Sequence, residues 1–184
     1  MVNRSTQRLD APPELFSHYS QILDQLSRAL PERFHPKLSE VVRGGLPLLF
    51  RPEYPVVLNH GDLLEMNIHV DGESGRITGI VDWADAKVAP FGTSLWGLET
   101  ILGVQTWSSW IFHPKHEDLR AQFWQTFHDA AGDLSDTDQR AIEVGRLLGL
   151  FRAYGFDRHP EKENAAPITE EHFNFVCLEA FCLR

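Results

Sequence analysis

Three polar side chains with the chemistry to act on a phosphate group stand close to short predicted strands. Asp62 and Asn67 lie within 58–67, Leu-Asn-His-Gly-Asp-Leu-Leu-Glu-Met-Asn, and Asp82 follows the next β-branched run. The Asp-Gly-Glu-Ser-Gly turn at 71–75 predicts a β-hairpin that returns Asp82 to the end of the structure holding the other two. Two carboxylates and an amide at one place suit phosphoryl transfer, which requires a positioned hydroxyl and a held Mg²⁺.

A simpler interpretation exists for each residue taken alone. Asp and Asn in loops commonly bond their own backbone and shape a turn, with no part in chemistry. For Asp62 or Asn67 in isolation, that interpretation is the better one. The combination of both with Asp82, across a hairpin of suitable length, favours an active site.

The motif resembles the catalytic loop of protein kinases, in which the spacing is His-x-Asp-x-x-x-x-Asn. His-Gly-Asp followed later by Val-Asp-Trp is similar to the variant found in the aminoglycoside phosphotransferase and choline kinase group. This resemblance implies an α+β, mainly helical, protein-kinase-like fold that uses ATP and Mg²⁺. It also implies that Asp62 is the catalytic base, that Asn67 and Asp82 ligate Mg²⁺, and that His60 supports the loop. Trp83 stands where protein kinases place the Phe after their metal-binding Asp.

Four further residues near the motif are candidates for substrate contact: Trp83, Asp85, Lys87 and Glu99. Asp85 is close enough in sequence to Asp82 to contact a metal or substrate, although a solvated loop carboxylate is the alternative. Lys87 would neutralise a phosphate if it faced the site, and otherwise it is an exposed lysine.

The elements that must hold these residues follow from the hydrophobic pattern. Three- and four-residue apolar steps predict a helix over 12–30, and a shorter one is expected over 38–43, before a loop at 44–47. Short β-branched runs predict strands at 56–58, 68–70 and 77–81. Helices are expected over 93–102, 117–130, 136–154 and 169–183, the third capped by the residues around Ser135. Together they predict one domain over residues 1–184.

The 59 residues before His60 lack the marks of the N-terminal lobe of a kinase. They contain no Gly-x-Gly-x-x-Gly run, no Val-Ala-x-Lys-like strand and no series of alternating strands. The resemblance is therefore to the C-terminal lobe, with the N-terminal lobe absent and a poor affinity for ATP expected. A partner chain or self-association that covers the cleft is one expected arrangement.

Composition limits the partners. Acidic residues outnumber basic ones by 26 to 17, giving a formal net charge of -9, which disfavours nucleic acid and anionic membrane surfaces. No apolar run approaches the roughly 20 residues that span a bilayer, and the polar start lacks a signal-peptide core. We expect a small-molecule substrate and a cytoplasmic location.

Three functions remain open from the sequence. The first is a phosphotransferase acting on a hydroxyl of a small hydroxylated or amino-alcohol molecule, or the catalytic lobe of one. The second is acid–base chemistry on a small organic molecule without ATP, with Asp62 or Asp82 as the proton carrier. The third is a non-catalytic pseudokinase that uses the same residues as scaffold. The identity of the substrate is not encoded in any motif.

Overall fold

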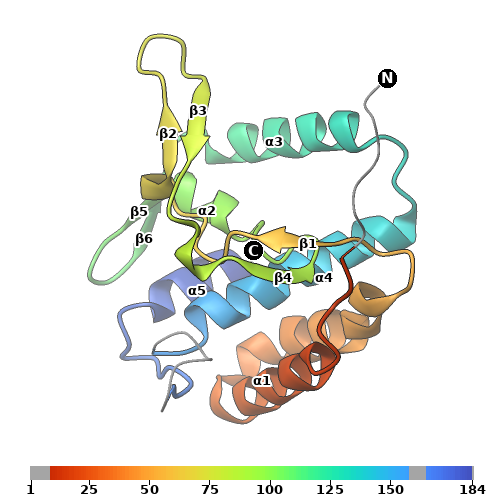
Figure 1. The fold of residues 1–184 in the computed structure, drawn as a ribbon. Helices are drawn as coiled ribbons and strands as arrows, with labels where there is room; N and C mark the ends of the chain where they lie inside the picture. The colour runs from red at the N-terminus through yellow and green to blue at the C-terminus, as the bar shows by residue number, and fades with distance from the viewer. Residues whose placement is uncertain (1–8, 158–164, 184) are drawn as a thin grey trace.

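The fold combines helices with three small antiparallel sheets, as seen in a computed structural model that describes residues 9–157 and 165–183 (Figure 1). About half of the chain is helical. The α-helices are α1 (Leu15–Ala29), α2 (Gly97–Ile101), α3 (His116–Ala131), α4 (Asp136–Tyr154) and α5 (Phe175–Cys182). The strands are β1 (Val56–Asn59), β2 (Ile68–Val70), β3 (Ile77–Ile80), β4 (Lys87–Pro90), β5 (Gly103–Gln105) and β6 (Trp110–Phe112). Tighter or wider helical turns occupy Glu32–Phe34, Pro36–Arg43, Leu46–Phe50, Glu65–Asn67 and Trp83–Asp85.

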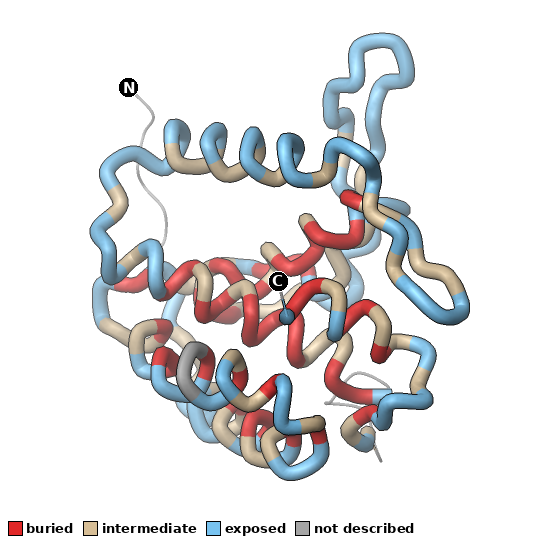
Figure 2. The backbone as a smooth tube through the Cα atoms, turned by 180° about the vertical axis from the view of Figure 1, so that it is seen from behind, coloured by how far each residue is buried: buried red, intermediate tan, exposed pale blue. Residues whose placement is uncertain are grey.

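The hydrophobic core lies in the helical part of the molecule. Leu23 and Leu26 of α1, Leu148 and Phe151 of α4 and Leu178 of α5 are all fully buried in one cluster. Figure 2 shows the buried residues gathered in this layer, while the hairpin of β2 and β3 has no buried residue and is mostly exposed. The helices therefore supply most of the hydrophobic core, and the strands that carry the motif lie against this helical layer.

Strand pairing determines which loops meet. β1 pairs antiparallel with β4 so that Asn59 lies opposite Lys87. The chain that leaves β1 and the chain that enters β4 are thus neighbours, although 27 positions separate them in sequence. β2 and β3 form a separate antiparallel hairpin between them, which projects from the body (Figure 1). This arrangement brings the segments 60–67 and 81–86 to one place.

Most predicted elements are confirmed. The helices expected over 12–30, 38–43, 117–130 and 136–154 are present, the second as part of the wider turns Pro36–Arg43, and Ser135 caps α4 by accepting a hydrogen bond from the Asp138 N–H. The strands expected at 56–58, 68–70 and 77–81 are β1, β2 and β3.

Four expectations about local structure are corrected. The loop expected at 44–47 is helical, the helix expected over 93–102 contains only α2 in its second half, and the one over 169–183 contains only α5. Strands β4, β5 and β6 were not predicted, because segments of three or four residues carry too little periodicity to identify.

The segment before β1 contains helices and turns. No strand occurs in its described part, residues 9–55. This agrees with the expectation that these residues do not build the β-sheet lobe of a kinase. In the described part of the chain, no helix combines the length and the apolar character needed to cross a membrane.

A buried ion pair ties α2, α3 and α4 together. Glu99 of α2 accepts two hydrogen bonds from Arg120 of α3, at 3.0 and 2.7 Å, and Arg146 of α4 lies 4.0 Å from the same carboxylate. Only 6% of Glu99 is exposed. Because α3 contains no buried residue, this polar contact and the ring contacts of His116 with Phe112 and of Phe127 with Phe91 attach it to the body.

We expect Glu99→Gln to lower the free energy of unfolding by about 3 kcal/mol, since it leaves Arg120 without the carboxylate that compensates its charge, while Arg146 keeps its hydrogen bonds to Glu143. Urea unfolding followed by tryptophan fluorescence measures the change. Glu117→Gln is the control, because the Glu117 side chain is 85% exposed on the same helix as Arg120. That variant should change the free energy by less than about 0.5 kcal/mol. Equal losses in both variants would contradict the prediction.

Candidate active site

The loop after β1 turns sharply at a glycine. Gly61 has a φ of +77°, and a Cβ built there would lie 2.4 Å from the carbonyl oxygen of Asp85. The N–H of Asp62 donates to the carbonyl of His60 at 2.9 Å, and the N–H of Leu64 donates to the carbonyl of Asp62 at 2.9 Å. Only glycine fits this left-handed position and close approach, so the loop lies directly against the segment that follows Asp82.

Asn67 fixes the position of Asp62. Its side chain is buried, and its amide nitrogen donates to the Asp62 carbonyl at 2.8 Å and, more weakly, to the Asp62 carboxylate at 3.4 Å. The Asn67 carbonyl accepts from the N–H of Val81 at 3.0 Å. A single residue therefore connects the loop that carries Asp62 to the backbone immediately before Asp82.

His60 makes a second connection to the same place. Its Nε2 donates to the Val81 carbonyl at 2.7 Å, and its ring meets that of Trp83 edge-on with centroids 4.7 Å apart. Trp83 is held in turn by a hydrogen bond from Nε1 to the Ile80 carbonyl at 2.9 Å. His60 is 3% exposed. The expected supporting role fits this geometry, because the imidazole positions the backbone around Asp82 without reaching solvent.

Asp82 has an unusual backbone conformation. With φ 60° and ψ 60° it is the one non-glycine residue at positive φ in the described part of the chain. Such residues cost on the order of 1–3 kcal/mol and cluster at functional sites. The bonds that Val81 makes to His60 and Asn67 hold the strained residue in place. The structure therefore places its strained non-glycine residue at the position that the sequence predicts as a metal ligand, a feature that the sequence did not reveal.

The donors at this site suit Mg²⁺. Asp62, Asn67 and Asp82 present carboxylate and amide oxygens, and with the Asn67 amide nitrogen turned to Asp62, its oxygen Oδ1 remains to serve as a ligand. Mg²⁺ needs only one or two protein carboxylates when substrate phosphates complete its shell. Within residues 9–157 and 165–183, no three His, Cys, Asp or Glu side chains form a group that could hold a metal.

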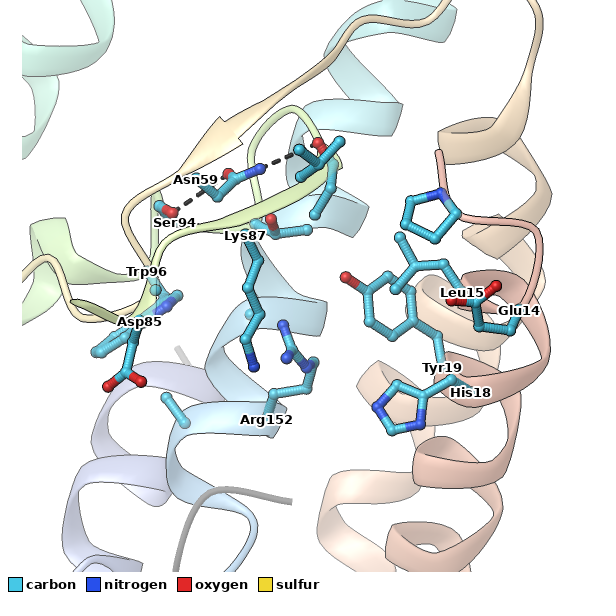
Figure 3. A pocket seen from close by; sticks show the side chains of 17 residues that line it. Glu14, Leu15, His18, Tyr19, Asn59, Asp85, Lys87, Ser94, Trp96 and Arg152 are labelled. Atoms are coloured by element: carbon cyan, nitrogen blue, oxygen red, sulfur yellow. Dashed lines mark hydrogen bonds between the residues drawn. The ribbon is translucent and has the colours of Figure 1, made fainter. Parts of the chain in front are cut away.

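A cavity of about 420 Å³ lies beside the loop, between α1, β4 and α4 (Figure 3). Gly61, Asp85 and Lys87 line it on the side of the motif, and Arg152 of α4 and His18 of α1 line it on the other. Two of the residues proposed from sequence for substrate contact, Asp85 and Lys87, therefore face a space large enough for a small organic molecule.

The other two lie elsewhere. Glu99 is occupied by Arg120 and does not line the cavity. Trp83 is 46% exposed and lines a smaller depression of about 190 Å³ on the other side of β1. The structure thus connects His60, Asp62 and Asn67 to one another and to Val81, the residue before Asp82, and it holds Glu99 in an ion pair with Arg120.

Sequence reasoning missed several residues of this region. Asn59 is buried and donates to the Ala89 carbonyl at 3.0 Å while accepting from Ser94 at 3.2 Å, so it secures the β1–β4 junction. Burial, and then the charges of Cys177, Glu65 and Asp62, raise the pKa of the Tyr154 phenol on α4. Residues that reach the site from distant helices have no local motif by which to be found.

Comparison with protein families identifies a match. The family model described as the phosphotransferase enzyme family (APH) matches residues 3–128, which include the loop, the hairpin and Asp82. Comparison with curated proteins and with solved structures gave no match.

The left-handed conformation of Asp82 can be tested directly. Asp82→Gly should be more stable than Asp82→Ala by about 1 kcal/mol, because a Cβ is disfavoured at positive φ and glycine adopts it freely. Urea unfolding of the two variants measures the difference. At Asp85, where the backbone is in a short helical turn, the same pair should show the opposite order. If Asp82→Ala were the more stable variant, residue 82 would not have a left-handed backbone conformation.

Proposed function

Since the chain belongs to the phosphotransferase enzyme family, we propose that it transfers the γ-phosphoryl group of ATP to a hydroxyl of a small molecule, with Mg²⁺. The observation that carries this proposal is the set of bonds through which Asn67 and His60 connect Asp62 to the backbone before Asp82. Catalysis of phosphoryl transfer depends mainly on such positioning.

Each residue has a defined role in this proposal. Asp62 accepts the proton of the attacking hydroxyl, and the amide of Asn67 keeps its carboxylate in place. Asn67 Oδ1 and the Asp82 carboxylate hold the metal, which when bound neutralises charge on the transferred phosphoryl group. His60 is a positioning residue, because it acts only through the Val81 carbonyl.

We propose that the nucleotide base binds on the apolar face of the exposed hairpin. Ile68 lies opposite Ile80, and Val70 lies opposite Ile77 across a register shift, so these four side chains share one face. Val70 and Ile77 are 58% and 65% exposed. We assign the adenine to the part of this face nearest Asp82, at Ile80. A partner chain or a second copy of the protein is our candidate for the cover of the exposed Val70 and Ile77.

A second function is favoured by one observation. The cavity beside the loop has apolar walls that include Leu15, Val88 and Trp96, as expected for a site that binds an organic molecule. Acid–base chemistry in that cavity without ATP would use Asp62, the neighbour of the cavity-lining Gly61, as the proton carrier. Activity that needs neither ATP nor Mg²⁺ would identify this alternative.

The first test concerns the two carboxylates. Asp62→Asn and Asp82→Asn should each reduce Mg²⁺-dependent ADP release by about 10²–10⁴-fold, as expected when a base or a charge-stabilising group is removed. The assay couples ADP release to a panel of hydroxylated metabolites, with and without Mg²⁺. Glu73→Gln is the matched control, because Glu73 lies in the exposed hairpin turn between the two sites. No turnover and no Mg²⁺-dependent nucleotide binding by the unaltered protein would refute the proposal.

The second test concerns the binding site of the adenine base. Ile80→Gln should weaken binding of Mg²⁺·ATP by about tenfold, because it removes apolar surface from the proposed adenine contact. Ile101→Gln makes the same change at an exposed isoleucine of α2 and should leave affinity unaltered. Titration calorimetry measures both. Equal effects at the two positions would exclude the hairpin face as the nucleotide site.

A further inference from the structure

The hairpin of β5 and β6 has an apolar outer face. It projects from the edge of the body (Figure 1), and Val104 of β5 lies directly opposite Ile111 of β6. Both side chains are exposed, to 61% and 54%. The alternate residues Trp110 and Phe112 pack on Phe181 of α5, with ring centroids 4.7 and 6.3 Å apart. Because the solvent face of such a hairpin is ordinarily polar, an apolar outer face is typical of a surface that binds another molecule.

Trp107 stands at the tip of the same hairpin. It is 91% exposed, the highest value among the large apolar side chains of the described residues. Thr106 fixes the turn by donating from its N–H and its hydroxyl to the Ser109 carbonyl, each at 2.8 Å. The indole meets the ring of Phe173 edge-on with centroids 5.6 Å apart, and the Phe173 carbonyl accepts from Gln105 Nε2 at 2.8 Å. Trp107 is therefore held before any partner arrives, which lowers the entropy lost on binding.

A depression of about 350 Å³ lies beside this indole. Its walls are Gln105, Thr106, Trp107 and Phe173. A protruding aromatic side chain and a hollow that could receive one thus adjoin on a single surface. An interface with two-fold symmetry brings the same patch of both subunits together. About such an axis, Trp107 of each copy would enter the depression of the other.

The absence of charge on the hairpin favours a second copy as the partner. Residues 100–112 contain no charged side chain, although 23% of the chain is charged and the formal net charge is -9. Two copies of an acidic protein repel each other where their charged surfaces meet, and a neutral patch lets them meet without like charges face to face. Of the acids near Phe173 in sequence, Glu170 is paired with Arg33 at 2.9 Å and Glu171 is exposed.

We propose that the β5–β6 hairpin is a symmetric interface between two copies of this chain, with Val104, Ile111 and Trp107 at its centre and Phe173 in the wall that receives the partner's indole. The surface belongs to a different sheet from the hairpin of β2 and β3, and the proposal does not depend on the phosphotransferase activity. From their exposed fractions, these four side chains offer roughly 500 Å² per copy, counting about 200 Å² for a whole aromatic side chain. A standard interface buries about 800 Å² per partner, so we expect a reversible dimer with a micromolar Kd.

Sedimentation velocity on the full chain tests the proposal. Over roughly 1–100 µM, which spans a micromolar Kd, the mass should rise from 21.0 kDa toward twice that value. Salt should not dissociate the dimer, because it screens the repulsion between acidic copies and leaves apolar contacts intact. A protein that stays monomeric throughout, or a dimer that dissociates in about 1 M NaCl, would overturn the proposal.

Variants locate the interface. Trp107→Ser and Ile111→Ser should each weaken the dimer by about tenfold or more, because each removes apolar surface twice in a symmetric pair. Both residues are exposed, so the variants should keep the stability of the unaltered protein. Leu119→Ser removes an exposed leucine of α3 and is the matched control. If Ile77→Ser on β3 dissociates the dimer and Ile111→Ser does not, the second copy binds the other hairpin and the proposal is wrong.

Disulfide trapping tests the symmetry. With a two-fold axis near Trp107, the new thiols of Ser108→Cys should meet and form an intermolecular disulfide in oxidised glutathione. Glu73→Cys places a thiol in the exposed turn of the other hairpin and should stay monomeric. The native Cys177 and Cys182 are buried and do not compete. A disulfide in the Glu73 variant alone would contradict the placement.

A lipid surface is the other occupant to test, because exposed tryptophan and aliphatic side chains also bind membrane interfaces. Co-sedimentation with phosphatidylcholine vesicles measures it. The unaltered protein should remain in the supernatant. If it instead stays monomeric in solution and binds the vesicles, and Trp107→Ser abolishes that binding, the hairpin is a lipid-binding surface and the dimer proposal is wrong.

Discussion

The antiparallel register of β1 with β4 places Asn59 opposite Lys87, and the geometry of the site depends on it. The loop that leaves one strand and the loop that enters the other have to run side by side from that point. Gly61 then lies against the backbone of Asp85, and only the absence of a side chain permits that contact. A different register would separate the proposed base from the proposed metal ligand and would also turn Lys87 away from the cavity.

Backbone bonds, more than contacts between the functional side chains, assemble the proposed active site. Val81 receives a hydrogen bond from His60 at its carbonyl and gives one to Asn67 from its N–H. These bonds offset the cost of holding Asp82 in the left-handed region. Asp82 is exposed and Asp62 is half-buried, so in the proposed function a metal ion and a nucleotide would reach both carboxylates. Catalysis by positioning needs a rigidly held backbone and metal ligands that the substrate can reach.

The exposed hairpin and the enclosed cavity lie on different sides of the same motif. The hairpin presents Val70 and Ile77 to solvent, a surface of the kind that soluble proteins normally cover. The cavity, by contrast, is built between helices of the rigid core and β4. In the proposals made here, the nucleotide and a covering chain belong to the first, and the second is the candidate site for an organic molecule, with Gly61 of the catalytic loop in its wall.

Features that depend on residues close together in the sequence follow from the sequence alone. The spacing from His60 to Asn67, the hairpin turn and the apolar steps of α1 and α4 are written in consecutive residues, so the elements and the motif could be predicted. Only the tertiary structure decided what depends on distant segments meeting. Glu99 forms an ion pair with Arg120 and takes no part in the site. Strand β4 forms because β1 lies beside it as its pairing partner. Lys87 and Arg152 share a cavity because a strand and a helix pack around it, and no pattern in either segment encodes that encounter.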